Sequence, residues 1–252
     1  AGDTITTGQS NTLMGYETGQ ALTDSESNAF FGMQAGYAST TSDNNTFLGW
    51  RAGFANTTGA NNTAVGSGTL LNSQSGSNLL ALGKDAGITG SPGGNFVSDS
   101  NYVLLGDENI THAYIQVDWT IASDERDKTD FTALDLGLDF VKDLKPVTYK
   151  WDKRSKYGDK YADDYDLDAQ TPDGTHKEDW LDIGFKAQEV EALEIAAGYN
   201  KSSKTNLTTT LTSDGKQYGI QYNKFVPILV KAIQEQQTLI ESLTARITTL
   251  EG

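Results

Sequence analysis

The nine residues Asn45-Thr-Phe-Leu-Gly-Trp-Arg-Ala-Gly53 are one copy of a unit that repeats through the first half of the chain. Glycine returns every 17 residues at the fifth place of this unit, and an asparagine stands four residues before each of the first four such glycines. The glycines are Gly15, Gly32, Gly49, Gly66 and Gly83, and the asparagines are Asn11, Asn28, Asn45 and Asn62. A short fixed period predicts one structural unit stacked many times.

Each unit predicts a short strand between turns, because a brief apolar run such as Thr46-Phe-Leu48 is flanked by Gly, Asn, Ser and Thr. Such a strand buries little by itself, so its apolar face must be covered by the next unit or by another chain. Long aliphatic runs are scarce, which favours a core shared between subunits. We therefore expect residues 1–100 to form a mainly β, trimeric repeat shaft of intertwined or stacked short strands. A monomeric β-solenoid or a low-complexity linker is the alternative.

The composition changes near residues 119–123. Residues 1–122 hold two basic and ten acidic side chains, whereas residues 123–252 hold 17 basic and 24 acidic ones. We expect residues 101–122 to be a transition and residues 123–252 to be a separate charged domain. The net charge of −15 argues against nucleic-acid partners. The absence of cysteine excludes thiolate metal sites, and no apolar run is long enough to predict membrane insertion. The chain begins with alanine and shows no signal peptide, so we expect a fragment or a processed product.

The last 27 residues have an apolar period of seven, typical of a coiled coil. The first seam position holds Val226, Ile233, Ile240 and Ile247, and the second holds Leu229, Gln236, Leu243 and Leu250. This pattern predicts a long coiled-coil helix over residues 223–252, with Asn223 as its cap and Pro227 in its first turn. Isoleucine and leucine at these positions nominally favour a dimer, while Gln236 could fix the register of a trimer. An amphipathic helix on a domain surface is the single-chain alternative.

Four ordered blocks resemble one known family. They are Thr120-Ile-Ala-Ser-Asp-Glu-Arg-Asp-Lys-Thr-Asp130, Leu144-Lys-Pro-Val-Thr-Tyr-Lys-Trp151, Gly184-Phe-Lys-Ala-Gln-Glu-Val190 and the stretch from Tyr222 to Glu235. The chain is similar to the intramolecular chaperone auto-processing domains at the C-termini of phage tailspikes and tail fibres. That family opens with Ser-Asp-x-Arg-x-Lys, which Ser123, Asp124, Arg126 and Lys128 match. Asp127 departs from the family, where an aliphatic residue is common.

The resemblance implies a fold, a chemistry and a set of residues. Residues 123–252 would form an α+β chaperone domain that ends in a trimeric coiled-coil helix. Ser123 would be the nucleophile and Lys128 the general base of a single-turnover autoproteolysis, without multiple-turnover activity. Supporting roles would fall to Arg126, Gln188 and Glu189, and neither a cofactor nor a metal is expected.

Elementary chemistry agrees with a serine–lysine pair but leaves the cleaved bond open. A serine hydroxyl needs a base, and a lysine serves as one when burial lowers its pKa from about 10.4 toward neutral. Lys128 is five residues from Ser123, close enough for contact across a tight loop. The resemblance favours cleavage of the Ser123–Asp124 bond, whereas attack on the preceding carbonyl would cut Ala122–Ser123.

The resemblance also implies partners and a location. We expect a homotrimer in the virion tail, assembled in the host cytoplasm, where the released chaperone would remain. The mature fibre would bind a host surface receptor, either a saccharide or an outer-membrane protein. The alternatives are a purely structural or adhesive trimeric fibre without processing, and part of a polysaccharide-degrading tailspike. The aspartates of residues 163–168 are interpreted as a solvated acidic insertion, because Ala169 and Thr175 stand where a calcium loop needs Gly and Glu.

Overall fold

The computed structural model describes residues 1–202 and 205–252, and it divides into two compact units. The first unit comprises residues 1–113 together with 151–178 and 212–217. The second comprises residues 114–150, 179–211 and 218–252. Each unit has a hydrophobic core of its own.

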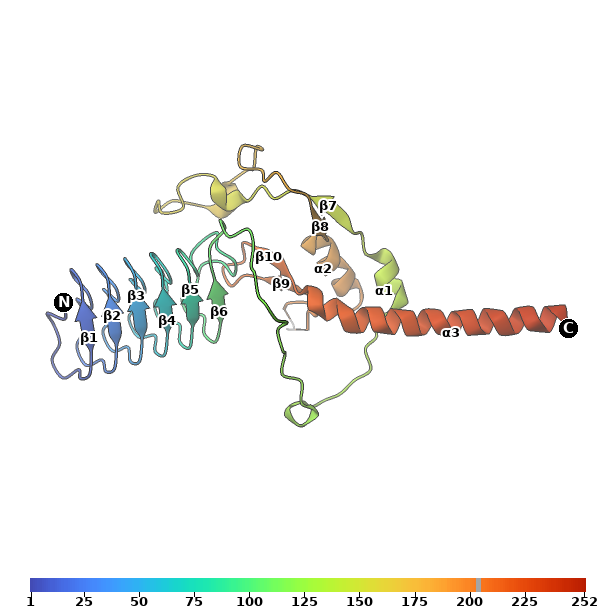
Figure 1. The fold of residues 1–252 in the computed structure, drawn as a ribbon, viewed down its shortest axis with the longest axis horizontal. Coiled ribbons are helices and arrows are strands. Elements are labelled where there is room, and N and C mark those ends of the chain that lie inside the picture. Colours follow the sequence, from blue (N-terminus) through green and yellow to red (C-terminus); the bar gives the residue numbers. More distant parts are fainter. Residues whose placement is uncertain (203–204) are drawn as a thin grey trace. The chain divides into compact units, whose positions relative to one another are not determined.

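The first unit is built around a parallel sheet of six three-residue strands that pair in chain order (Figure 1). The strands are β1 (Thr12–Met14), β2 (Ala29–Phe31), β3 (Thr46–Leu48), β4 (Thr63–Val65), β5 (Leu80–Leu82) and β6 (Val103–Leu105). Every strand is one repeat away from its neighbour, so that Phe30 pairs with Phe47 and Phe47 with Ala64. The predicted shaft of stacked short strands is therefore confirmed.

The core of the shaft lies within a single chain. The middle residue of each strand points inward, and the rings of Phe30 and Phe47 stack with centroids 4.8 Å apart. Phe47 is only 1% exposed. Each coil thus covers the apolar residue of the previous coil, which is how such short strands come to be buried.

The repeated glycines allow neighbouring coils to approach closely. Gly49 has φ of +144°, and a Cβ there would lie 2.4 Å from the carbonyl oxygen of Gly66. Gly32 stands in the same relation to Gly49. A larger residue at these positions would force the coils apart, which explains the strict 17-residue period.

The repeated asparagines form a buried ladder between coils. The Asn28 side-chain oxygen accepts from the backbone N–H of Asn45 at 2.9 Å, and the Asn45 oxygen accepts from Asn62 in the same way. The Asn45 amide also donates to the carbonyl of Gly59 at 2.8 Å. The left-handed conformation belongs instead to the preceding residue, such as Asn44 with φ of +57°. The asparagine of each unit therefore joins coils by its side chain.

Two segments from later in the sequence complete the first unit. Residues 151–178 contain the 3₁₀ helices η2 (Arg154–Lys156) and η3 (Leu167–Ala169). Residues 212–217 form a turn, in which Asp214 accepts from the backbone N–H of Asn95 at 2.9 Å. Both segments contact the coils near β5 and β6.

The second unit combines short helices with two antiparallel strand pairs. Its elements are α1 (Leu138–Asp143), β7 (Val147–Tyr149), β8 (Asp182–Gly184), α2 (Ala187–Ala196), β9 (Thr209–Leu211), β10 (Tyr218–Ile220), η4 (Tyr222–Lys224) and α3 (Phe225–Glu251). Strand β7 pairs with β8, and β9 pairs with β10. The core holds Leu136, Phe140, Val190, Phe225 and Ile228. The predicted α+β domain with a long terminal helix is confirmed.

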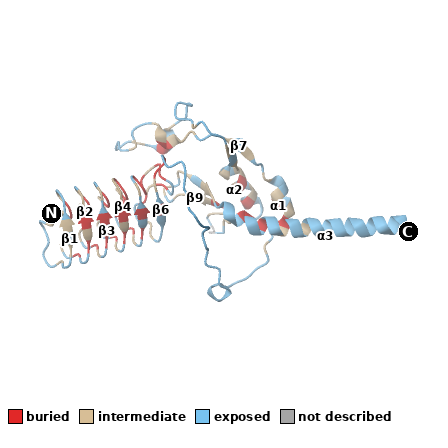
Figure 2. Ribbon diagram, in the orientation of Figure 1, coloured by how far each residue is buried: buried red, intermediate tan, exposed pale blue. Residues whose placement is uncertain are grey.

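Helix α3 uses only its first turns inside the unit. Phe225, Ile228 and Ala232 are buried, and most of the remaining helix is exposed (Figure 2). The residue before the helix is Lys224, whereas Asn223 lies inside η4, so the prediction of Asn223 as the cap is wrong. Because the preceding 3₁₀ turn runs directly into α3, no capping side chain bonds to the helix start.

Candidate functional site

The residues of the Ser-Asp-x-Arg-x-Lys motif lie on one exposed turn. The 3₁₀ helix η1 (Glu125–Asp127) forms it, and the Asp124 carboxylate accepts from the backbone N–H of Arg126 at 2.9 Å. The backbone N–H of Lys128 donates to the carbonyl of Glu125 at 3.1 Å. An aspartate before a short helical turn is a favourable cap, so the local sequence is sufficient to form this turn.

The turn brings the two predicted catalytic side chains together. Lys128 Nζ lies 2.6 Å from Ser123 Oγ and 3.2 Å from the backbone carbonyl oxygen of Ser123. Both residues are exposed. The amine is thus within proton-transfer distance of the hydroxyl, and it also contacts the carbonyl of the Ser123–Asp124 bond.

Arg126 holds the carboxylate of the neighbouring aspartate. Its Nη2 is 2.6 Å from Asp124 Oδ2, and its Nε is 3.0 Å from Asp124 Oδ1. The hydrogen bond from the Arg126 side chain lowers the pKa of Asp124 below its usual range. A carboxylate already paired with Arg126 leaves the Lys128 amine to contact Ser123.

The other two predicted supporting residues lie on helix α2 with different partners. Glu189 pairs with Lys186 at 3.0 Å, and this hydrogen bond lowers the pKa of Glu189. Gln188 is exposed. Within residues 1–202 and 205–252, no printed hydrogen bond or ion pair joins either side chain to Ser123 or Lys128. Their supporting role stays a prediction.

Comparison with known families identifies part of the chain. Residues 123–199 match the family described as chaperone of endosialidase. The chain carries the chaperone domain of a phage tail fibre or tailspike. No curated protein and no solved structure matches the chain. The family match begins at Ser123, includes the serine–lysine turn, and ends before α3.

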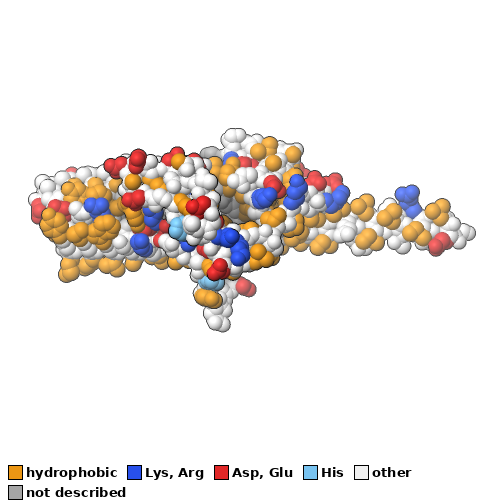
Figure 3. Space-filling view, turned by 90° about the horizontal axis from the view of Figure 1, so that it is seen from above, with side chains coloured by type: hydrophobic (Ala, Val, Ile, Leu, Met, Phe, Trp, Pro, Cys, Tyr) orange, Lys and Arg blue, Asp and Glu red, His pale blue; other side chains and the backbone are white. Residues whose placement is uncertain are grey.

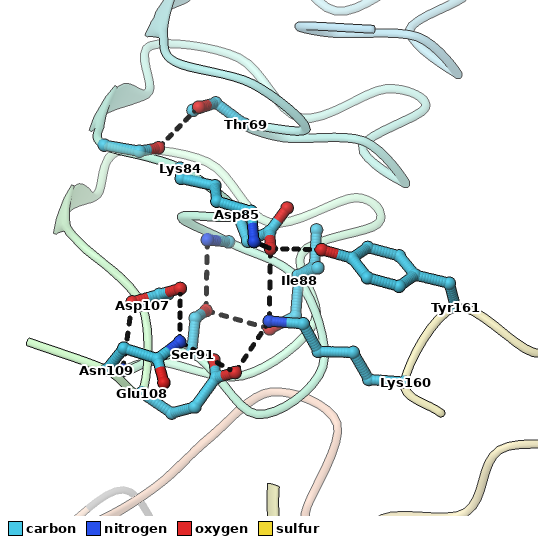
Figure 4. A network of polar contacts seen from close by, with 12 residues as sticks. Thr69, Lys84, Asp85, Ile88, Ser91, Asp107, Glu108, Asn109, Lys160 and Tyr161 are labelled. Atoms are coloured by element: carbon cyan, nitrogen blue, oxygen red, sulfur yellow. Dashed lines mark hydrogen bonds and ion pairs between the residues drawn. The ribbon is translucent and has the colours of Figure 1, made fainter. Parts of the chain in front are cut away.

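Part of the chaperone match packs against the shaft through a buried ionic cluster that the sequence did not predict (Figure 4). Lys160 Nζ lies 3.1 Å from Asp85 and 2.7 Å from Glu108, and the Tyr161 hydroxyl donates to Asp85. All three of these charged side chains are largely buried. Burial alone would lower the pKa of Lys160, but the hydrogen bond and charge of Glu108 outweigh it and raise the pKa.

A second buried carboxylate organises the other unit. Glu194 on α2 is fully buried and accepts hydrogen bonds from the backbone and hydroxyl groups of Thr208 and Thr209. These contacts join α2 to the start of β9. Because every donor is satisfied by the same carboxylate, Glu194 is a structural anchor of the chaperone domain.

The acidic insertion is tied to basic partners. Asp168 lies 2.5 Å from Arg154, and Asp166 pairs with Lys216. Within the described residues, no group of three or more His, Cys, Asp or Glu side chains is arranged to hold a metal ion. None of the helices in residues 1–202 and 205–252 combines the length and apolar character needed to cross a bilayer.

Proposed function

We propose that this chain is the C-terminal part of a phage tail fibre or tailspike whose chaperone domain assembles three copies and is then released by self-cleavage. Residues 123–252 would bring the copies together through α3, and residues 1–100 would form the shaft. Residues 101–122 would join the two parts. The mature fibre would then contact a host surface.

The contact between Lys128 Nζ and Ser123 Oγ, 2.6 Å long, carries the proposal of self-cleavage. In this mechanism a neutral Lys128 amine takes the hydroxyl proton, and the oxygen attacks a backbone carbonyl at the turn. The contact of the same amine with the Ser123 carbonyl oxygen supports cleavage of the Ser123–Asp124 bond, because a cationic donor stabilises the developing oxyanion. Attack on the preceding carbonyl would instead release a fragment that begins with Ser123.

Assembly would supply the burial that the single chain lacks. The whole turn of residues 123–128 is exposed to water, where a lysine amine stays protonated. If neighbouring copies cover the turn, loss of water favours the neutral amine and activates the serine. Cleavage would then follow completed assembly, and release of the chaperone would leave a fibre held by a high unfolding barrier.

The test compares freshly expressed variants by gel and intact mass. The unchanged chain should yield two fragments, while Ser123→Ala and Lys128→Ala should stay uncut and still assemble. Lys128→Arg is the matched control, because arginine keeps the charge and the reach but cannot become neutral. A Lys128→Arg protein that is cut at the normal rate would refute the role of Lys128 as base. The mass of the released fragment shows whether it begins with Asp124 or Ser123.

The role of the mature fibre in host attachment rests on the domain it carries. The proposed receptor is a saccharide or an outer-membrane protein, and binding of the processed shaft to host cells compared with glycan-depleted cells distinguishes the two. Release of reducing sugars by the shaft would instead favour a polysaccharide-degrading tailspike.

A further inference from the structure

The outer face of the six-stranded sheet is an exposed apolar surface. In each three-residue strand the middle side chain points into the coil, so that the first and third side chains point outward. Leu48 is 46% exposed and Leu105 is 52% exposed. The third positions form one row, which consists of Met14, Phe31, Leu48, Val65, Leu82 and Leu105.

The second outward row is also uncharged. It consists of Thr12, Ala29, Thr46, Thr63, Leu80 and Val103. The two rows together, here called the ladder face, contain no polar group larger than a threonine hydroxyl. Hydrophobic side chains gather along the shaft in the space-filling view (Figure 3). An uncharged face is unusual in a chain whose net charge is −15, and a soluble protein rarely exposes such a strip without a partner.

We propose that the ladder face is where the shafts of three copies of this chain pack together around a common axis. The proposal rests on the proposed function, since it takes three assembled copies as its starting point. It adds that the shaft has its own contact surface between copies, separate from the contact made by α3. The occupant of each ladder face is therefore the ladder faces of two further copies.

The charge of the chain favours copies of itself at this face. Two surfaces that share a net charge of −15 repel each other wherever their acidic side chains meet. The ladder face is free of charge, so copies can approach there without this cost. In addition, rows on parallel copies have the same strand spacing of about 4.8 Å, so every side chain meets its own equivalent.

The size of the ladder face also identifies its occupant. Six strands give a strip of roughly 30 Å by 10 Å, or on the order of 300 Å². A stable interface between free proteins buries about 800 Å² on each partner, so this strip is too small to capture a partner from solution. It is adequate for copies that are already held together, because tethering raises their effective concentration.

A second exposed surface on the same chain supplies that tether. The heptad positions of α3 face away from its buried residues, with Ile233 64% exposed and Leu250 85% exposed. A heptad seam is filled by equivalent helices of other chains, and parallel helices bring equivalent shafts into register. Two unpartnered apolar surfaces, one in each unit, thus require the same kind of partner.

Disulfide cross-linking tests the proposal, because the chain contains no cysteine. The full chain with Ser123→Ala keeps both units joined, and Leu48→Cys adds one thiol on the ladder face. Around a threefold axis only two of three equivalent thiols can pair, so oxidation should convert roughly two-thirds of the chains to covalent dimers and leave one-third unlinked. Complete conversion would overturn the threefold arrangement.

Two matched variants separate this proposal from the proposed function. Ile240→Cys reports the contact between α3 helices, and Thr58→Cys places an exposed thiol on the segment that joins β3 to β4. Cross-linking at position 240 without cross-linking at position 48 would overturn the shaft contact and leave trimerisation intact. Failure at both positions would overturn both. Equal cross-linking at positions 48 and 58 would mean random collision and would also overturn the ladder-face contact.

Discussion

At the scale of single residues, the shaft depends on asparagines whose side chains replace backbone pairing between coils. Asn45 accepts from the N–H of Asn62 and donates to the carbonyl of Gly59, and all of these atoms are buried. The side chain therefore satisfies two backbone groups that water cannot reach. The next coil has leucine at the corresponding place, where the N–H of Leu79 still bonds to Asn62. The ladder ends there because leucine has no amide to continue it.

Replacement of Asn45 by alanine should destabilise the shaft by about 3 kcal/mol, because it leaves two buried backbone groups without partners. The measurement is the free energy of urea unfolding at a fixed protein concentration. Asn44→Gly is the matched control: this neighbour is exposed and has φ of +57°, which glycine adopts without strain, so the variant should change the free energy little. Equal losses for the two variants would contradict the ladder.

The sequence predicted contacts between residues that are close along the chain. The spacing of Ser123 and Lys128 allowed their contact, and the cap at Asp124 makes it. The cluster of Lys160 with Asp85 and Glu108 could not be predicted in the same way, because the partners are 75 and 52 residues away and no local pattern pairs them. The predicted supporting residues Gln188 and Glu189 came from a motif alone, and their reach to the dyad depends on tertiary structure.

At the scale of elements, α3 is anchored to the chaperone domain by one carboxylate at the start of α1. The Glu235 side chain accepts from the backbone N–H of Leu138 at 2.7 Å and pairs with Lys231 at 3.3 Å. A Cβ at position 137 would overlap this carboxylate, so Gly137 gives it access to the helix start. The backbone hydrogen bond, followed by the Lys231 contact, lowers the pKa of Glu235.

This anchor should weaken in acid. A carboxyl whose folded-state pKa lies below its unfolded value stabilises the fold above the unfolded value, about 4.3 for Glu, and loses that effect as the pH falls through the folded-state value. The unfolding temperature of Glu235→Gln should therefore be lower than that of the unchanged chain at pH 7. The gap should shrink as the pH is lowered below about 4. A gap that is the same at pH 7 and pH 3, or that also appears for Glu251→Gln, would argue against the anchor.

Elements with strong periods were predictable, and those without were not. The 17-residue period located the strands, and the heptads located α3. Residues 151–178 contain no regular strand or long helix, and they are held by nonlocal ionic contacts, so neither period could reveal that they pack on the shaft. The core of the shaft was expected to be shared between subunits, yet stacked phenylalanines bury it within one chain. The shared surface that we propose lies on the opposite side of the same strands.

At the scale of the whole molecule, the two units divide the work of assembly. The ladder face is too narrow to associate alone, and the α3 seam is long but gives no register to the repeats beyond the helix. Slow pairing of repeats between copies is prone to misalignment and aggregation, so a helix that joins the copies first would protect the shaft. The chaperone role of the domain thus has a physical basis in the unequal size of its two apolar surfaces.

If α3 is the tether, charges placed in its seam should cost the shaft its solubility as well as its oligomeric state. Ile240→Asp with Ile247→Asp puts like charges where equivalent helices meet, and both positions lie beyond Phe225, Ile228 and Ala232, so the fold of the chaperone domain is retained. Light scattering should show loss of trimers, and the soluble fraction after expression should fall several-fold.

The matched control places the same two charges away from the seam, at Thr238 and Ala245. Because these positions face outward in the heptad, the control should remain trimeric and soluble. Soluble native trimers from the seam variant would show that the shaft assembles without its tether, since the ladder face would then be sufficient despite its size. Loss of trimers in both variants would instead point to a general effect of added charge on an already acidic chain.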